Sequence, residues 1–256
     1  MPAVTPRVIL VRHTPMPEEL IASAAKLCYA SKTEAILEQE HDKAAGFVEQ
    51  LAAMGHMSPI EHVVFTYYLE GVSRALTHQL VRHRIASYSQ RSQRYVGHAA
   101  FDYIIPPRLE GKTVETENGP VDAVAYFEQT MELIAARYRA LNAALGNTGE
   151  SSKEDARYVL PNACETKIFV TMNARELVHF LEERLCMRAQ WEIRAVAEQM
   201  LRLAQEACPA VFAGRGPKCV RMNVCPEGKM TCGHFAHMKA KFGENPGKTA
   251  SKGTDA

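Results

Sequence analysis

The chain has 256 residues, 46% of them hydrophobic, and its formal net charge at neutral pH is +1. This length suits one large domain or two small ones, with enough apolar residues for a substantial core. The near-neutral charge argues against a general nucleic-acid-binding protein, because such domains usually carry a strong basic surplus.

The sequence predicts a chain that mixes strands and helices. Apolar runs rich in β-branched residues indicate strands, and apolar residues three or four apart indicate helices. In the first half we predict strands over 7–13 and 63–68 and helices over 17–29, 41–54 and 72–81. In the second half we predict strands over 101–105 and 167–172 and a long helix over 121–145. A short helix should begin at a capping box formed by Ser151 and Glu154 and end before Pro161, and a further helix should begin after Asn173. We expect a loop and an internal boundary at 108–121, within an α/β (α+β) fold whose mixed or antiparallel sheet is flanked by long helices.

The segment from Gln79 to Tyr95 is the most unusual part of the sequence. It contains four arginines and one histidine but no acidic residue. Guanidinium groups bind carboxylates and phosphates through paired hydrogen bonds, and the hydroxyl and amide side chains between them add orientation. The segment therefore predicts an anion-binding site, and the alternative is a solvated basic loop.

Part of this segment resembles the signature of a known enzyme family. Arg82-His83-Arg84, followed by seven residues and then Ser92, is similar to the signature of the flavin-dependent thymidylate synthases (ThyX). Other similar positions are Gln79, Ser87, Arg94, Tyr95 and the segments 55–62, 173–184 and 189–193. The resemblance implies a ThyX-like fold and a homotetramer with sites built between subunits. The resemblance covers roughly residues 7–213, so we predict a catalytic domain over 1–213 and, outside the resemblance, a cysteine- and lysine-rich appendage over 214–256.

The resemblance implies a particular reaction. The enzymes of this family methylate dUMP to dTMP without a covalent enzyme nucleophile. The carbon comes from 5,10-methylenetetrahydrofolate, and the hydride passes from NADPH through tightly bound FAD. The expected partners are therefore small molecules and further copies of the chain, with no nucleic acid and no membrane.

The resemblance also assigns residues to ligands. Arg184 is the expected catalytic residue, because a cation at the edge of the uracil ring stabilises the ring's anionic form. Besides Arg184, the residues expected to bind dUMP are Gln79, Leu80, Val81, Arg82, Gln90, Arg91, Ser92, Gln93, Arg94 and Arg157. Those expected to bind FAD are Ser58, Arg82, His83, Arg84, Gln90, Asn173, Ala174, Arg175 and His179, with Glu61 close by. His56 and Tyr95 are expected near the folate.

Helix geometry separates two of these arginines. At about 100° per residue, Arg175 and His179 share one helix face, whereas Arg184 lies about 180° from Arg175. We therefore expect Arg175 to serve the flavin and Arg184 to serve the nucleotide. The sequence departs from some members of the family at Ser89, Gln90 and His179, which puts individual ligand contacts in question.

Nucleophilic catalysis has little support in the sequence. No cysteine lies in a recognisable nucleophile setting. Ser92 has no histidine or lysine base placed beside it by the sequence, so we expect it to bind substrate. Two other function classes stay open: a non-catalytic nucleotide- or RNA-binding module, and a different flavoprotein that acts on a phosphorylated substrate.

The C-terminal tail is rich in cysteine and lysine. Cys219, Cys225 and Cys232 lack any Cys-x-x-Cys pair, so we expect free thiols and no metal there. We expect no metal at His56 and His62 either, since no second ligand pair has suitable spacing. Residues 243–256 are predicted to be disordered. Seven cysteines and the absence of a secretion-signal pattern favour reduced thiols and a cytoplasmic location.

Overall fold

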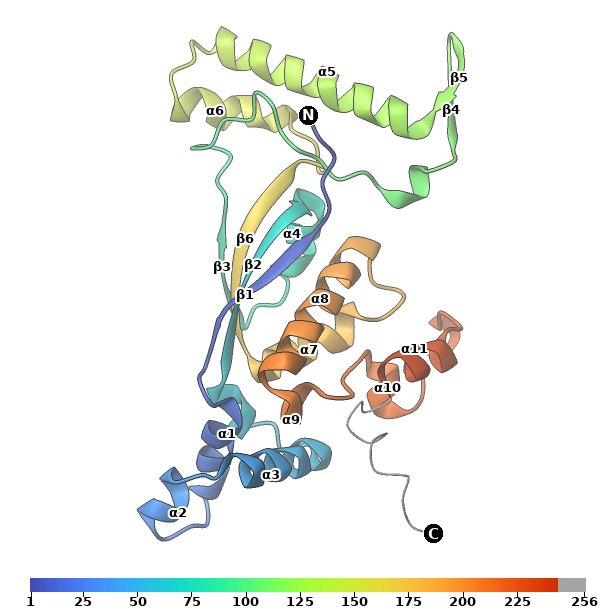
Figure 1. Cartoon of the computed structure of the whole chain (residues 1–256). Coiled ribbons are helices and arrows are strands. Elements are labelled where there is room, and N and C mark those ends of the chain that lie inside the picture. The colour runs from blue at the N-terminus through green and yellow to red at the C-terminus, as the bar shows by residue number, and fades with distance from the viewer. Residues whose placement is uncertain (244–256) are drawn as a thin grey trace. The chain divides into compact units, whose positions relative to one another are not determined.

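The computed structural model describes residues 1–243, which form both helices and strands (Figure 1). Four strands make one sheet in the order β1-β2-β6-β3. Their bounds are β1 Arg7–His13, β2 Val64–Ser73, β3 Ala86–Gln90 and β6 Glu165–Asn173. Two short strands, β4 (Thr113–Thr116) and β5 (Gly119–Asp122), form an antiparallel hairpin. The predicted α+β class is confirmed.

The chain divides into two compact units, each assembled from separate parts of the sequence. The first unit contains residues 1–7, 69–82 and 88–169. The second contains residues 8–68, 83–87 and the chain from residue 170 onward. The sequence predicted an internal boundary at 108–121, which is wrong because this stretch lies inside the first unit. It also predicted a boundary near residue 213, and the catalytic domain over 1–213 stays a prediction.

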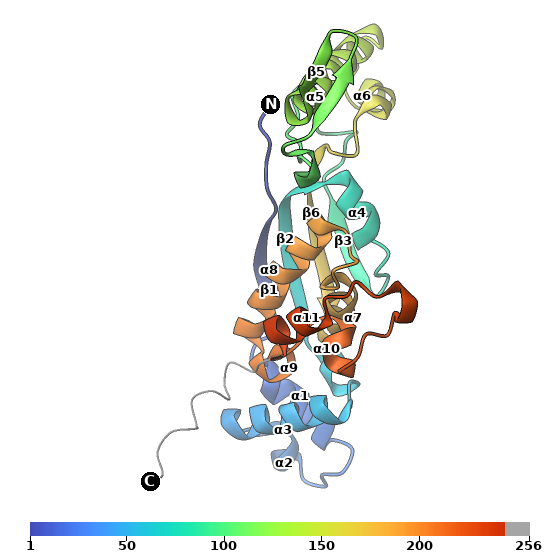
Figure 2. The same cartoon turned by 90° about the vertical axis from the view of Figure 1, so that its right-hand side faces the viewer.

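The first unit is built around its long helix. Its helices are α4 (Arg74–Leu80), α5 (Ala123–Ala144), α6 (Glu150–Ala156) and the 3-10 turns η2 (Pro107–Leu109) and η3 (Arg157–Val159). The Asp122 carboxylate accepts a hydrogen bond from the Ala125 amide at 2.9 Å and so caps α5. Met131 and Ala135 of α5 pack with Phe101, Tyr103 and Cys164. Helix α6 lies beside α5 (Figures 1 and 2).

A glycine is required where β2 passes the N-terminal segment. Gly71 has a φ of +64°, a backbone conformation that residues with a Cβ rarely adopt. A Cβ at this position would lie 2.1 Å from the Thr5 carbonyl oxygen. The Gly71 amide is thereby free to point at a side chain of the functional site, described below.

The second unit is mostly helical. Its helices are α1 (Pro17–Lys26), α2 (Thr33–Leu37), α3 (His41–Met54), α7 (Ala174–Arg184), α8 (Trp191–Ala207), α9 (Pro209–Phe212), α10 (Lys218–Met222) and α11 (Phe235–Phe242), with 3-10 turns η1 (Pro59–His62) and η4 (Gly228–Met230). The predicted helix 41–54 is confirmed, and Gly55 ends it in the left-handed conformation. Asn173 caps α7 as predicted, since its side-chain oxygen accepts the Glu176 amide at 2.8 Å. Leu177 and Phe180 of α7 are fully buried with Val196 and Met200 of α8.

Several predicted element boundaries are wrong. The helix predicted over 72–81 starts only at Arg74, because β2 continues to Ser73 and the Ser73 hydroxyl caps the helix. The helix from Pro17 ends at Lys26 instead of Tyr29. Residues 101–105 form no regular strand; Tyr103 makes isolated bridges to Ala3 and Cys164.

Two local predictions in the polar regions are also wrong. The stretch 108–121 is not an open loop but carries the β4–β5 hairpin. Ser151 does not cap α6, because Gly149 occupies the cap position and the Ser151 hydroxyl bonds to Thr148. The predicted disorder over 243–256 falls outside the described residues except for Gly243. Within residues 1–243, no helix is long and apolar enough to cross a membrane.

Candidate functional site

The basic segment predicted as a loop contains regular structure. It starts in the last turn of α4, passes a turn at Val81 and Arg82, and continues as strand β3 to Gln90. Leu80 is buried, and its carbonyl accepts a hydrogen bond from the Tyr88 hydroxyl at 2.9 Å. Gln79 is half-buried, whereas Val81 and Arg82 are exposed. The strand fixes which side chains of the segment share a face.

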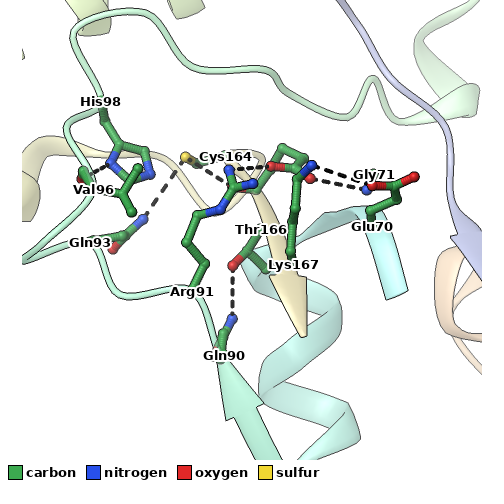
Figure 3. A network of polar contacts seen from close by, with 11 residues as sticks. Glu70, Gly71, Gln90, Arg91, Gln93, Val96, His98, Cys164, Thr166 and Lys167 are labelled. Carbon is green, nitrogen blue, oxygen red and sulfur yellow. Dashed lines mark hydrogen bonds and ion pairs between the residues drawn. The ribbon is translucent and has the colours of Figure 1, made fainter. Parts of the chain in front are cut away.

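Arg91 belongs to a buried ionic network in the first unit (Figure 3). Its guanidinium nitrogen Nη1 lies 3.3 Å from Oε2 of Glu165, the first residue of β6. The other oxygen of Glu165 accepts the Gly71 amide at 3.1 Å. The Glu165 side chain is only 7% exposed, so this carboxylate is bound on both oxygens inside the protein. The absence of acids within the segment is therefore compensated by an acid that is distant in sequence.

Two amide side chains beside Arg91 are also held in place. Nε2 of Gln90 donates to the hydroxyls of Thr77 at 3.0 Å and Thr166 at 3.3 Å. Nε2 of Gln93 lies 3.9 Å from the sulfur of Cys164. Because the amide nitrogens are used in this way, the Gln90 carbonyl oxygen stays available as an acceptor for a ligand.

Cys164 is the cysteine closest to this network, and its thiol is not ionised. Cys164 is fully buried, and burial raises the pKa of its thiol to about 12, with the Glu165 carboxylate adding to the rise. The nearby guanidinium groups of Arg74 and Arg91 oppose the shift without cancelling it. A thiol with this pKa is a poor nucleophile at neutral pH, because the thiolate is the reactive form.

Arg94 lies between two carboxylates of α6. Its guanidinium is 2.6 Å from Glu150 and 2.7 Å from Glu154, and its side chain is 41% exposed. The Arg157 Nε donates to the Glu154 carbonyl oxygen at 3.1 Å. The Ser92 hydroxyl accepts the Arg94 amide at 3.1 Å. Exposed ion pairs of this kind contribute little stability, so an incoming anion can replace the carboxylates at small cost.

The second unit holds a separate cluster around His83. The Arg184 Nε donates to Nε2 of His83 at 3.0 Å, and Nδ1 of His83 lies 3.5 Å from Oε1 of Glu176. The ring of His179 lies 5.6 Å from that of His83, measured between centroids. His83 and Glu176 are buried, whereas Arg184 is half-buried and His179 is exposed. The arrangement joins His83 of the basic segment to residues at both ends of α7.

His83 is neutral near pH 7. The pKa of its imidazole is lowered to about 4, mainly by burial and also by the positive charge of Arg184 and by His179, while Glu183 opposes the shift. Because Nε2 accepts from Arg184, the single proton of the neutral ring must sit on Nδ1, facing Glu176. Burial also raises the pKa of the Glu176 carboxyl. The neutral imidazole therefore acts as an acceptor that orients the Arg184 guanidinium.

This cluster also has the spacing of a metal site. The ligand atoms of His83, Glu176 and His179 all lie within 4.8 Å of one another. However, Nε2 of His83 is already an acceptor for Arg184, whose charge would repel a cation. The sequence-based expectation of no metal therefore stays a prediction at this cluster.

The titration of His83 predicts how stability depends on pH. Its pKa is about 4 in the folded chain against an ordinary value of 6.5, so the unfolded chain binds more protons between these values. The contribution of the neutral His83 to folding stability is complete above about pH 6.5 and is lost as the pH falls toward 4. The raised pKa of Glu176 acts in the opposite direction, because it lowers stability as the pH rises through its own titration.

We expect urea unfolding of His83→Gln to depend less on pH than that of the wild type between pH 4 and pH 6.5. Parallel curves for the two proteins would contradict the assignment.

A large cavity in the second unit is lined by several arginines. Its volume is about 1080 Å³, and α3, α7 and the segment after α9 form its walls. Arg175 and His179 of α7 line it together, as the helix geometry predicted. Arg215 and Arg221 contribute two further guanidinium groups. Arg175 is held at 2.5 Å from Glu61, and both side chains are about half exposed.

The remaining predicted residues have simpler surroundings. Arg184 does not line this cavity but a smaller one, of about 240 Å³. The two arginines of α7 thus open on different spaces, which agrees with their expected 180° separation. Asn173 and Ala174 are fixed at the start of α7. His56, Ser58, Arg84 and Tyr95 are exposed, and the Tyr95 carbonyl accepts from Lys153.

The sequence did not single out several important residues. Glu165, Glu176, Arg215 and Arg221 were all missed as site residues. Glu165 contacts Arg91, and Glu176 contacts His83, across long sequence separations. Arg215 and Arg221 share a cavity with Arg175 and His179, so no local motif could reveal any of the four. Glu176 lies within the family-like segment 173–184, but the sequence analysis assigned it no role.

These features define an α+β protein with two arginine-rich regions suited to anionic ligands. A sequence model described as "Thymidylate synthase complementing protein" matches residues 9–210. The chain is 51% identical over 246 residues to a protein of Nitratidesulfovibrio vulgaris named flavin-dependent thymidylate synthase, covering 92% of this chain and 97% of the relative. Proteins of the same name from Clostridium tetani and Pyrococcus abyssi are 48% and 40% identical, covering 91% and 86% of this chain and 95% and 89% of the relatives.

The chain belongs to the flavin-dependent thymidylate synthase family of enzymes. The alignment with the Nitratidesulfovibrio protein covers 92% of this chain. The aligned region must therefore extend past residue 213 into the cysteine-bearing tail. The sequence analysis had placed this tail outside the family resemblance.

Proposed function

We propose that this chain methylates dUMP to dTMP, with 5,10-methylenetetrahydrofolate as carbon donor and NADPH as reductant through tightly bound FAD. The observation that carries the proposal is the identity of 51%, over nearly the whole chain, to a protein named for this activity. We further propose a ThyX-like homotetramer that works in the cytoplasm. Family membership favours an enzyme over the alternative of a non-catalytic nucleotide- or RNA-binding module.

The first unit offers groups for the nucleotide. Arg94, Arg157 and Ser92 would hold the phosphate, because guanidinium groups form paired hydrogen bonds with phosphate oxygens. In the structure, Glu150 and Glu154 neutralise Arg94. Binding of dUMP would exchange these exposed carboxylates for the phosphate. Gln79 to Arg82 and Gln90 to Gln93 would surround the remainder of the nucleotide.

Arg91 would act as a fixed wall of the nucleotide site. Its pairing with the buried Glu165 and the binding of Glu165 to the Gly71 amide leave it little freedom. A side chain that is already ordered loses less conformational entropy when the ligand binds. The network in Figure 3 would therefore preorganise this side of the site.

The large cavity of the second unit suits FAD. Its volume of about 1080 Å³ is at the upper end of ordinary ligand pockets, as a dinucleotide requires. Arg175, Arg215 and Arg221 supply positive charge for a pyrophosphate, and His179 supplies a ring edge. Asn173, Ala174, Ser58, Arg82, His83 and Arg84 complete the residues we propose for the cofactor. When bound, FAD would relay the hydride of NADPH to the reacting carbon, and His56 and Tyr95 would lie near the folate.

Neither Cys164 nor Ser92, both in the nucleotide region of the first unit, is set up as an activated nucleophile for the pyrimidine ring. Cys164 keeps its proton because burial raises the pKa of the thiol to about 12. In the nucleotide region of the first unit, the Ser92 hydroxyl is used as an acceptor for the Arg94 amide. We therefore propose that the uracil ring is activated electrostatically by Arg184, which holds the negative charge that develops on the ring.

Removal of Arg175 should weaken flavin binding. A charge-assisted hydrogen bond contributes about 1.5–3 kcal/mol, so Arg175→Ala should raise the Kd for FAD roughly 10- to 100-fold. The matched control is Arg202→Ala, because Arg202 is exposed on α8 and pairs only with Glu206 among the contacts of the described chain. Fluorescence titration of both apoproteins with FAD measures the difference. Equal affinities would remove Arg175 from the cofactor site.

The proposed function is tested by spectra of the purified protein. We expect bound flavin whose visible absorbance disappears when NADPH is added without oxygen. The absorbance should return only after dUMP and methylenetetrahydrofolate are both added. A colourless protein with no affinity for FAD would favour the binding-module alternative. Bleaching by NADPH without any response to dUMP would favour a different flavoprotein.

A further inference from the structure

Four of the seven cysteines gather on one cavity of the second unit. Cys186, Cys219, Cys225 and Cys232 all line the cavity of about 240 Å³. Cys186 follows α7, Cys219 lies in α10, and the other two lie between α10 and α11. All four are free thiols, and Cys219 is buried while the other three are half-buried. The sequence analysis considered only the three tail cysteines and so missed the fourth potential ligand.

The chain around these cysteines has little apolar core of its own. Between Lys218 and Gly243, the only buried apolar side chains are Cys219, Met238 and Phe242. Met222, Val224 and Met230 are large apolar residues that remain exposed. A small segment with so few buried residues needs another source of stability, and a structural metal is a common one.

Ion pairs connect this segment to α7 and its surroundings. Arg221 lies 2.6 Å from Glu182, Lys218 pairs with Glu183, and Arg188 pairs with Glu227. These pairs are partly exposed and individually contribute little. The cavity wall contains the cations Arg184, Arg188 and Lys218 and an equal number of carboxylates, Glu182, Glu183 and Glu227. Because each of these carboxylates is paired with a cation, the wall adds no unpaired negative charge to a four-thiolate metal centre.

We propose that Cys186, Cys219, Cys225 and Cys232 bind one structural metal centre that fixes the segment 218–243 against the end of α7. Four thiolates are the ligand set of structural zinc and of iron–sulfur clusters. With zinc, four metal–sulfur bonds form and the four thiol protons are released to solvent, with no change in oxidation state. The tail expected to carry free thiols thus becomes a metal-binding element, through a ligand 33 residues upstream of Cys219.

The thiols have to move inward when the metal binds. Among residues 1–243, the group His83, Glu176 and His179 is the only one whose ligand atoms already lie within 4.8 Å of one another. The four cysteines line a common cavity instead.

Metal analysis of the untagged protein tests the proposal. Protein purified without chelators and without air should contain about one zinc ion per chain, or several irons with equal acid-labile sulfide for a cluster. Cys225→Ser and Cys186→Ser should each lose most of this metal. Cys28→Ser is the matched control, because Cys28 is exposed and does not line this cavity. His179→Gln should also retain the metal, which separates this centre from the His83 cluster.

A second measurement does not depend on isolating the native metal. The apoprotein, prepared with a chelator, should take up one added Zn²⁺ per chain and then protect these four cysteines from alkylation, while Cys28 stays reactive. Added Zn²⁺ should also slow tryptic cleavage after Arg221 and Lys229. The proposal would be overturned if the native protein contained no metal and took up no added zinc. It would also be overturned if the metal remained in Cys225→Ser or was lost in His179→Gln. None of these readouts requires catalytic activity, so they stand apart from the proposed function.

Discussion

Replacing Arg184 with alanine should lower turnover by about 10²- to 10³-fold, the usual effect of removing one preorganised charge-stabilising donor. Flavin should still bind, because Arg175 and His179 line a different cavity from Arg184. NADPH should still reduce the flavin. The step that should slow is flavin reoxidation by dUMP with methylenetetrahydrofolate.

The position of Arg184 depends on its neighbours. Its Nε donates to the neutral His83, and His83 in turn faces Glu176. The remaining guanidinium nitrogens are therefore aimed by a buried pair and not by chance surface contacts. Glu182 and Glu183 are the acids that precede Arg184 in the sequence. In the structure these two acids bind Arg221 and Lys218 instead, so they do not occupy Arg184.

Stopped-flow measurement of each half-reaction checks this prediction. Arg184→Lys should recover only part of the loss, because an ammonium group does not reproduce the planar guanidinium. Arg202→Ala, on the exposed face of α8, should behave like the wild type. The metal content of Arg184→Ala should be measured as well, since Arg184 also lines the cysteine cavity. Normal flavin reoxidation in Arg184→Ala would show that another group activates the ring.

Replacing Glu165 with glutamine should lower the free energy of unfolding by about 2–3 kcal/mol. Glutamine has the same shape and can still accept the Gly71 amide. Its amide nitrogen would then face Arg91, which loses its carboxylate partner. Breaking one side of a buried ion pair is costly because the other charge stays in a region of poor solvation. The partial exposure of Arg91, 31%, keeps the expected loss below the largest values known for such pairs.

Urea unfolding at a fixed chain concentration measures the effect of Glu165→Gln. Glu206→Gln is the control, because it breaks a pair whose two side chains are more than 60% exposed. We expect a change of at most about 0.5 kcal/mol for that variant. If both variants unfold at the same urea concentration as the wild type, the network in Figure 3 does not stabilise the first unit.

Local patterns predicted much of the fold. The strand over 7–13, the helix over 41–54 with its Gly55 end and the Asn173 cap of α7 follow from side chains next to each other in sequence. The failures lie where distant contacts decide the outcome. Residues 101–105 look like a strand, but only Tyr103 pairs with another segment. Ser151 looks like a helix cap, but Gly149 reaches a conformation there that serine does not favour.

The candidate site shows the same division. Arg91 and Arg94 could be recognised because four arginines without an acid are conspicuous in a sequence. Their partners Glu165, Glu150 and Glu154 lie more than 50 residues away along the chain, so charge counting within the segment gave a misleading picture. The convergence of Cys186 with the tail cysteines was invisible for the same reason. The sequence therefore identified the arginines of the segment but not the acids that pair with them.

The central proposal is tested most directly by following dTMP formation with purified protein. Chromatography should detect dTMP when dUMP, methylenetetrahydrofolate, NADPH and FAD are all present. Omission of dUMP, the folate or NADPH should abolish the product. The proposal would be contradicted if NADPH fully reduced the bound flavin but no dTMP formed with dUMP and the folate in excess.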